Sequence, residues 1–261
     1  MPVLSSNHTR DETADTLFGG EIQVLQGKKG YRFSIDAILL AGFVWLRQKD
    51  RVIDLGTGVG IVPLILSKRG EDAAQIVGVE IQQELAALAK RNVLINGCED
   101  LITIYEVDIK ELNDTFSPSS FDVLVTNPPY YGISSGRINP HSQKAIARHE
   151  ITCTIDDVLQ ASCYLLKEGG RIFIIYPAQR AVTLLARLQS VSLEPKRIRW
   201  IYSREGEDAR FILTEAHKGG GEGVEVMPPL FIYSAQGSYT PEMETLYSIP
   251  LQIMARKGES K

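Results

Sequence analysis

Short apolar runs alternate with amphipathic stretches between about residues 50 and 190. The runs are rich in β-branched and aromatic residues and are mostly apolar on both faces, which is typical of strands buried in a parallel sheet. They cover residues 51–54, 75–81, 101–107, 121–126 and 171–176. Because strands that alternate with helices form βαβ units, the pattern predicts an α/β fold with helices on both faces of the sheet.

Helical periodicity fills the segments around these runs. Apolar residues recur every three or four positions, and the predicted helices cover residues 33–45, 61–68, 85–95 and 155–166. Thr154 is a candidate N-cap of the last helix, and Asp156 and Asp157 suit the positive end of the helix dipole. Beyond residue 190, runs at 197–202 and 210–216 predict a strand hairpin.

Composition narrows the class of protein. Of the 261 residues 44% are hydrophobic and 23% are charged, as in an ordinary globular protein, and no run is long enough to cross a membrane. The amino terminus lacks the layout of a signal peptide, so we expect a cytoplasmic protein. The three cysteines lack metal-ligand spacing, and we expect no metal site. A net charge of -4 argues against a uniformly basic surface but leaves room for a local basic patch.

A glycine-rich turn follows the first predicted strand. Asp54 ends the strand, and Gly56, Gly58 and Gly60 precede a helical pattern. Glycines at this place permit a tight turn and let a ligand approach the backbone, although a turn without a ligand explains them as well. In the dinucleotide fingerprint the third glycine comes one residue later, so this spacing favours S-adenosylmethionine over NAD.

Two carboxylates follow at the ends of the next strands. Glu80 closes the second strand 20 residues after Gly60, where it can accept hydrogen bonds from both ribose hydroxyls of a nucleoside. Asp108 follows the third strand and is placed to accept from the adenine amino group of the cofactor, although a solvated turn aspartate is an equal alternative. The neighbours of these motifs that we expect to line the cofactor site are Thr57, Ile81 and Ile109.

The fourth strand ends in Asn127, Pro128, Pro129 and Tyr130, at the edge where open parallel sheets bind ligands. Two prolines make a stiff turn that donates no hydrogen bonds, so an amide oxygen and a free carbonyl can converge on one NH2 group. Two acceptors aimed at a conjugated nitrogen stabilise the positive charge that develops when it is methylated. Tyr130 is placed to stack on a base taken out of its helix. The alternative is a purely structural turn with a surface tyrosine.

Taken together, these residues resemble the class I methyltransferase fold and its amino-methylating branch. Three further segments resemble the bacterial tRNA1(Val) (adenine(37)-N6)-methyltransferase family, which acts at the nucleotide 3′ of the anticodon. They are residues 31–41, 147–150 and 215–220. The resemblance covers nearly the whole chain. It implies a Rossmann-like sheet of seven strands, mostly parallel, with an antiparallel carboxyl-terminal hairpin, and tRNA as the partner.

The resemblance also implies roles for residues. Cofactor contacts carry over to Asp54, Gly56, Gly58, Glu80 and Asp108, and the catalytic segment runs from Asn127 to Tyr130. Asn127 is expected to contact the cofactor as well. Phe33 and Asp36 are expected to close over the cofactor, although packing of an amphipathic helix explains the apolar positions equally well. We expect an amino-terminal segment at 1–48, a methyltransferase domain at 49–240 and a tail at 241–261.

Substrate-binding residues are expected outside the catalytic segment. Arg148 and His149 are candidates for contacts with RNA, or else belong to a plain polar segment. Lys196, Arg197 and Arg199 crowd the final hairpin, where Arg204 and Arg210 also lie, and are candidates for a phosphate-binding face. The alternative is a charged hairpin that merely keeps the sheet edge soluble.

Other functions remain open at this stage. Glutamine N5-methylation of release factors presents the same NH2 geometry, but only about 50 residues precede Asp54, too few for the helical domain usual in those enzymes. Methylation of guanine N2 in ribosomal RNA is a further alternative. Outside catalysis, a module that only binds S-adenosylmethionine would have no use for the Asn127 segment.

Overall fold

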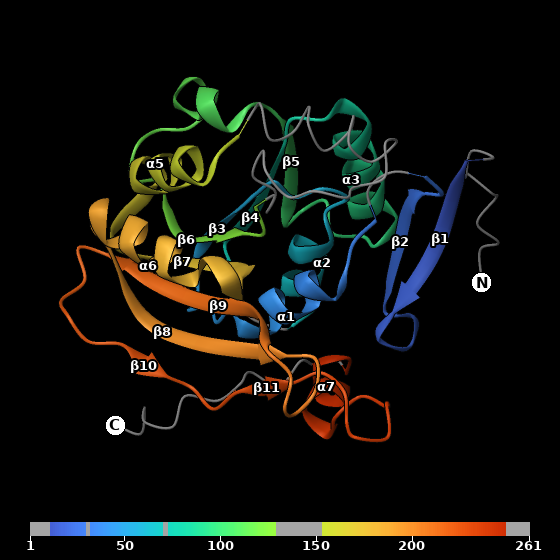
Figure 1. Cartoon of the computed structure of the whole chain (residues 1–261). Coiled ribbons are helices and arrows are strands. Elements are labelled where there is room, and N and C mark those ends of the chain that lie inside the picture. The colour runs from blue at the N-terminus through green and yellow to red at the C-terminus, as the bar shows by residue number, and fades with distance from the viewer. Residues whose placement is uncertain (1–10, 30–31, 70–72, 129–152, 249–261) are drawn as a thin grey trace.

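A mostly parallel sheet forms the centre of the structure, a computed structural model in which residues 11–29, 32–69, 73–128 and 153–248 are described (Figure 1). The main strands are β3 (Arg51–Leu55), β4 (Gln75–Glu80), β5 (Ile102–Glu106), β6 (Phe121–Thr126), β7 (Leu166–Pro177), β8 (Leu193–Tyr202) and β9 (Ala209–Lys218). Their order across the sheet is β5-β4-β3-β6-β7-β9-β8. All the predicted strands are therefore present, and they lie in one sheet.

The direction of the strands also confirms the predicted fold class. β3 to β7 pair in parallel, and β9 is antiparallel to both of its neighbours, β7 and β8. β10 (Glu225–Val226) and β11 (Leu230–Phe231) pair with β8, so the described sheet has nine strands instead of seven. Strands of two residues are too short to show any periodicity, which is why the sequence did not predict them.

Helices cover both faces of the sheet. α1 (Ile35–Phe43), α2 (Ile61–Lys68) and α3 (Gln83–Ile95) pack on one face, and α5 (Ile155–Leu165) and α6 (Ala181–Ser190) pack on the other. Successive side chains of a strand point to opposite faces. Val52 thus belongs to the core under α1 to α3, whereas Ile53 belongs to the core under α5 and α6. Three short 3-10 helices link the main elements: η1 (Phe18–Gly20), η2 (Ile109–Asp114) and η3 (Ala178–Arg180).

α5 begins at the predicted N-cap. The Thr154 hydroxyl accepts from the backbone N–H of Asp157 at 3.3 Å, and the Asp157 carboxylate accepts from the backbone N–H of Thr154 at 2.8 Å. The helix ends at Leu165 and β7 starts at once, five residues before the predicted strand. Gly169 has a φ of 71° at a shift in the β6–β7 register, so it forms an irregularity within the strand.

An antiparallel hairpin of β1 (Glu12–Leu17) and β2 (Ile22–Gly27) precedes the sheet and was not predicted. Asn92 of α3 and Asn96, which caps the end of α3, hold it. The Asn92 side chain exchanges hydrogen bonds with the backbone of Leu25 at 2.7 and 3.0 Å, and it also donates to the Val59 carbonyl at 2.9 Å. Asn96 repeats the exchange with Gln23 one helical turn later. The two side-chain amides therefore make the backbone hydrogen bonds to β2 that a neighbouring strand would otherwise make.

Asn92→Ala is expected to destabilise the protein by about 2 to 3 kcal/mol, because the buried backbone groups of Leu25 lose their partners. Urea unfolding measures the loss, and hydrogen exchange at the Leu25 amide locates it. Asn96→Ala is the matched control, because its contacts with Gln23 are exposed. Equal costs for the two variants would contradict this account.

The segment predicted as a tail begins with a helix, α7 (Pro241–Leu246). Met243 and Leu246 are buried in the same core as α1.

None of the helices in the described ranges is both long and apolar enough to span a bilayer.

Candidate active site

The turn after β3 has a backbone that requires glycine. Gly56, Gly58 and Gly60 have φ angles of 74°, 59° and 82°, in the left-handed region that side chains disfavour. The backbone N–H groups of Gly56 and Thr57 both donate to the Val79 carbonyl at 2.9 Å, which fastens the turn to β4. The predicted turn is thus a fixed part of the carboxyl edge of the sheet.

Glu80 ends β4 beside this turn. Its two carboxylate oxygens accept from the backbone N–H groups of Gly58 and Gln82, each at 2.9 Å. The Gln82 side-chain amide also donates to Oε1, at 3.4 Å. A carboxylate has about four lone-pair positions, so Oε2 can accept a further hydrogen bond, and a ligand hydroxyl could replace the long contact at Oε1. The side chain is therefore positioned by the protein and still able to bind a pair of hydroxyl groups.

Asp54 is buried at the end of β3, and its Oδ2 atom has no hydrogen-bond partner among the described residues. Burial raises its pKa to about 7, the nearby Thr57 hydroxyl lowers it, and the charge of Glu80 raises it. A buried carboxylate without a partner is costly, and a cation bound next to it would remove that cost. This orphaned oxygen fits a ligand with an ammonium group, as S-adenosylmethionine has.

Asp108 follows β5 and is half-buried. Its carboxylate accepts from the backbone N–H of Lys110 at 2.9 Å and caps η2. It therefore has the turn role that was the alternative to cofactor binding, and the two roles are compatible because a carboxylate accepts several hydrogen bonds. Ile109 beside it is half-buried, whereas Ile81, after β4, is 41% exposed.

Phe33 and Asp36 lie at the start of α1. Both side chains are half-buried, and the backbone N–H of Phe33 donates to the Gln26 side chain at 3.3 Å. Burial raises the pKa of Asp36, while Ser34 and the charge of Arg210 lower it. These contacts join α1 to the β1–β2 hairpin and to β9, and a role over the cofactor stays a prediction.

The end of β6 lies next to the glycine turn. Leu55 pairs with Thr126, and the buried Thr126 hydroxyl donates to the Leu55 carbonyl at 3.0 Å. Asn127 follows β6 and Gly56 follows β3, so the two residues leave neighbouring strands that are roughly 5 Å apart at the same edge of the sheet. Asn127 is half-buried and Pro128 is buried. The structure thus brings the start of the predicted catalytic segment to the predicted cofactor turn.

Several predicted site residues lie outside the described part of the chain. They are Pro129, Tyr130, Arg148 and His149. The described site consists of the ends of β3, β4, β5 and β6, with Asp54, Glu80, Asp108 and Asn127 each following or ending its strand.

The prediction of a phosphate-binding face at Arg197 and Arg199 is wrong. Arg197 is buried, and its guanidinium donates to Glu215 at 2.8 Å and to the Phe43 carbonyl at 2.9 Å. Arg199 is buried too and forms an ion pair with Glu242 at 2.7 Å. Because the two arginines are two residues apart in a strand, they share one face, and that face turns inward.

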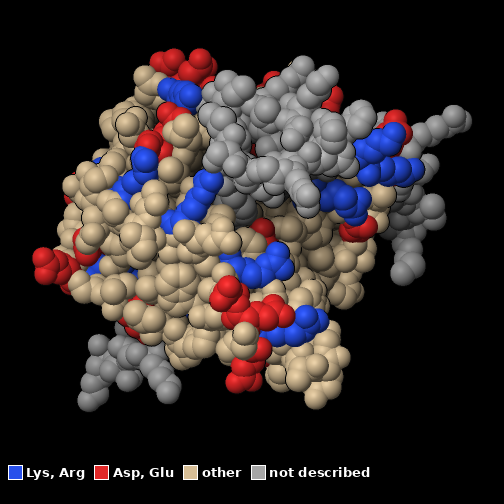
Figure 2. All heavy atoms as spheres, viewed as in Figure 1, with Lys and Arg blue, Asp and Glu red and all other residues tan. Residues whose placement is uncertain are grey.

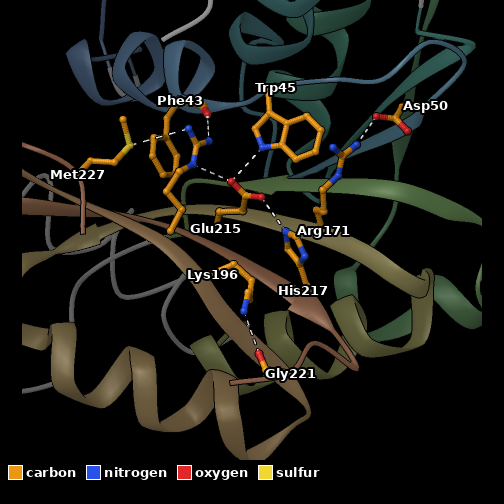
Figure 3. Close-up of polar contacts among 10 residues, drawn as sticks. Phe43, Trp45, Asp50, Arg171, Lys196, Glu215, His217, Gly221 and Met227 are labelled. Carbon is orange, nitrogen blue, oxygen red and sulfur yellow. Dashed lines mark hydrogen bonds and ion pairs between the residues drawn. The ribbon is translucent and has the colours of Figure 1, made fainter. Parts of the chain in front are cut away.

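Lys196 points to the other side of β8. It is half-buried, and its ammonium group donates to the carbonyls of Gly221 at 2.9 Å and Glu222 at 3.3 Å (Figure 3). These two hydrogen bonds do not test whether Lys196 contacts RNA, so that contact stays a prediction.

A buried polar cluster surrounds Glu215 of β9, which pairs with Phe173 of β7 and lies three strands from β3 (Figure 3). Glu215 is fully buried and accepts from Arg197, from Trp45 at 2.9 Å and from His217 at 2.7 Å. Burial alone would raise the pKa of Glu215, but the His217 hydrogen bond and the Arg197 charge outweigh it and lower the pKa to about 2. The cluster joins β8, β9 and the segment after α1, away from the candidate site.

A second buried ion pair adjoins this cluster. Arg171 of β7 pairs with Asp50, and its guanidinium lies 3.7 Å from the centre of the Trp45 ring. The sequence analysis singled out residues 215–220 only through the family resemblance and did not predict these buried ion pairs. The one signal in the sequence was Glu215, a carboxylate within an otherwise apolar strand, because a buried charge needs a partner.

Comparison with known proteins identifies one matching family and relatives that share one name. The family described as "Methyltransferase small domain" matches residues 35–191. A protein of Bacteroides thetaiotaomicron named tRNA1(Val) (adenine(37)-N6)-methyltransferase is 33% identical over 62% of this chain and 66% of its own length. A protein of the same name from Aeromonas salmonicida is 28% identical over 78% of this chain and 84% of its own length.

Solved structures show a likeness in fold. A predicted O-methyltransferase from Agrobacterium tumefaciens has a TM-score of 0.68 at 24% identity, covering 85% of this chain and 100% of its own. A putative transferase from Pyrococcus horikoshii has a TM-score of 0.55 at 13% identity, covering 80% of this chain and 72% of its own.

Proposed function

The chain belongs to the methyltransferase small domain family, and from that premise we propose that it transfers a methyl group from S-adenosylmethionine to the amino group of an adenine in tRNA. The observation that carries the proposal is the position of Asn127 and Pro128 directly beside the glycine turn that follows β3. A donor held at the turn and a nitrogen held at Asn127 would be neighbours.

S-adenosylmethionine supplies an electrophilic methyl group bound to a sulfonium sulfur. The described residues fit such a molecule. The orphaned oxygen of Asp54 suits the ammonium group, and the glycine turn presents a backbone that a ligand can approach. Glu80 can accept from one ribose hydroxyl at Oε2 and from a second at Oε1 in place of the long Gln82 amide contact. Asp108 caps η2 at the edge of the same site, where it can accept from an adenine amino group.

Asn127 and Pro128 would act on the nitrogen that accepts the methyl group. The amide oxygen of Asn127 accepts one N–H and the Pro128 carbonyl accepts the other. Both bonds strengthen as positive charge develops on the nitrogen, so they lower the barrier instead of merely binding the substrate. Thr126, whose hydroxyl is bonded to β3, keeps this acceptor pair at a fixed place relative to the turn.

The substrate class is proposed from the relatives. The two curated proteins reported above are named for N6-methylation of adenine 37 in tRNA1(Val), and their matched regions cover 62% and 78% of this chain. The sequence alone left release-factor glutamine and ribosomal guanine open, because all three targets present an NH2 group on a planar centre. We assign the adenosine 3′ of the anticodon in tRNA(Val). The cytoplasmic location expected from the sequence stays a prediction.

The proposal is tested by offering the pure protein S-adenosylmethionine with a labelled methyl group and, separately, unmodified tRNA, ribosomal RNA and release factor. Digestion of the product identifies the methylated residue. The expected product is N6-methyladenosine from tRNA alone. Methylglutamine from release factor, or N2-methylguanosine from ribosomal RNA, would overturn the substrate assignment.

Affinity for S-adenosylmethionine is expected to fall with decreasing pH below about 7. In the free protein the pKa of Asp54 is about 7, so below this pH the side chain is mostly protonated. An ammonium group binds to the carboxylate form, and binding must therefore release a proton. The dissociation constant should rise by up to about tenfold per pH unit between pH 7 and 5.5. Calorimetry in buffers of different ionisation enthalpy measures both the affinity and the released proton.

Asp54→Asn is the control for this titration. The variant is expected to bind more weakly at pH 8 and to lose the pH dependence. Wild-type affinity that is constant over the same range would show that Asp54 does not contact the cofactor.

A further inference from the structure

Arg180 and Arg210 lie at the carboxyl edge of the sheet. We propose that these two arginines bind the phosphates that flank the target nucleotide of the RNA substrate. The inference rests on the proposed function and adds the surface by which RNA would reach Asn127.

Strand register places Arg210 at the active edge. β9 runs antiparallel to β7, and Phe211 pairs with Pro177 at the end of β7. Arg210 comes just before Phe211, so it extends past the last pair on the side where β3, β4, β5 and β6 also end. The same side carries Asn127. Arg197 and the cluster around Glu215 are farther along the hairpin, toward the amino edge.

Arg180 reaches the same edge from the end of β7. It is the last residue of η3, which follows β7 directly and packs against β9. Ile174 of β7 pairs with Thr126, so Asn127 lies two strands from β9. With strands about 4.8 Å apart and a rise of about 3.3 Å per residue, the Cα atoms of Asn127 and Arg210 are roughly 14 Å apart. A nucleotide at Asn127 would have its neighbouring phosphates within reach of such long side chains.

Neither arginine is neutralised by an ion pair within the described ranges, unlike Arg197 and Arg199. Arg210 is exposed, donates to the Ser203 hydroxyl at 3.3 Å and lies 5.7 Å from the centre of the Phe211 ring. Its acidic neighbour is the half-buried Asp36, whose pKa its charge lowers. The two guanidinium groups therefore keep donors for a further anion.

The chemistry of the pair suits RNA phosphates. A guanidinium stays charged at any physiological pH, and its planar fork matches two phosphate oxygens. On the face shown in Figure 2, basic side chains are interspersed with acidic ones instead of forming one broad patch. A chain with a net charge of -4 must then hold RNA through a few well-placed cations, and two that lie beside the reaction centre serve this purpose.

Fluorescence polarisation with a labelled, unmodified tRNA(Val) transcript tests the proposal without relying on methyl transfer. Arg180→Ala and Arg210→Ala should each raise the dissociation constant about five- to tenfold. Each should also lower the slope of log affinity against log salt by roughly 0.7 to 0.9, because one fewer counterion is released. In methylation assays KM for tRNA should rise while kcat stays within twofold.

Matched controls separate this effect from unfolding or from a change in total charge. Arg187→Ala removes a half-buried arginine, ion-paired with Asp156, from the far end of α6 and should change RNA affinity less than twofold. Arg210→Lys keeps the charge and should recover part of the affinity. Melting temperature and the dissociation constant for S-adenosylmethionine should match wild type in every variant.

The possible failures can be told apart. Should the wild-type protein not bind tRNA, the proposed function fails and this inference falls with it. If the wild-type protein binds tRNA and both Arg180→Ala and Arg210→Ala have the same affinity and salt slope as wild type, the two arginines do not contact RNA. The proposed function would then still stand.

Discussion

Replacing Asn127 by alanine should lower kcat for methyl transfer to tRNA by about 10²- to 10³-fold. The amide oxygen is one of two acceptors that we place on the target nitrogen, and it would bind most tightly when that nitrogen becomes positive. The remaining acceptor, the Pro128 carbonyl, cannot orient both N–H bonds by itself. KM for tRNA should change much less than kcat, because the lost interaction belongs to the transition state.

Rapid-quench turnover at saturating cofactor and tRNA measures this loss. Asn113→Ala is the matched control, because Asn113 is an exposed asparagine of η2 outside the strand ends that form the site. The melting temperature of Asn127→Ala should stay near that of wild type, since the Thr126 hydroxyl ties β6 to β3. A variant with full activity would place the chemistry elsewhere.

Glu215→Ala should destabilise the folded protein by about 3 to 5 kcal/mol. Removal of the carboxylate leaves the Arg197 guanidinium buried without its counter-charge and takes the acceptor away from Trp45 and His217. For a chain of this size such a loss lowers the melting temperature by roughly 10 °C. Calorimetry and guanidinium unfolding both measure it.

The exposed pair of Arg204 and Glu207 is the matched control. Its atoms lie 3.5 Å apart and both side chains are about half exposed, so Glu207→Ala should cost less than about 1 kcal/mol. Equal costs for Glu207→Ala and Glu215→Ala would contradict a special role for the buried cluster.

The pH dependence of stability gives the same residue a second readout. The pKa of Glu215 is about 2 in the folded protein, against an ordinary value of 4.5. Because the folded-state pKa is depressed, the contribution is complete above the ordinary value and is lost as pH falls from about 4.5 through 2. Glu215→Gln should therefore flatten this part of the acid unfolding profile.

Much of the candidate site could be predicted because its signals are local. A strand (Arg51–Leu55), a glycine turn (56–60) and a helix (Ile61–Lys68) follow one another directly in the chain. The carboxyl ends of parallel strands necessarily meet at one edge of the sheet. Asp54, Glu80, Asp108 and Asn127 each mark such an end, so their gathering followed once the strands were predicted. The family resemblance rested on the same segments and agrees with the matched family.

The surface charges could not be predicted in this way. Arg197 and Arg199 looked like members of one basic face together with Arg210, since sequence shows the number of charges but not the direction of each side chain. Their carboxylate partners lie 18 and 43 residues further along the chain, in β9 and α7. Only the packing of those elements buried the pairs.

The β1–β2 hairpin was missed for a similar reason. Its stability depends on side-chain amides of α3, in particular Asn92, which pairs with Leu25 across 67 positions of the chain. In the sequence Asn92 is a polar interruption of a helical stripe, with no sign that it completes the edge of a strand.

Local periodicity and turn chemistry thus determined the βαβ order, the glycine turn and the strand end that carries Asn127, because these depend on residues close together in the chain. The tertiary structure decided which arginines are neutralised and buried, and which remain at the active edge. That outcome depends on which faces of distant elements meet, since the free energy of a charge is set by its surroundings and not by its position in the sequence.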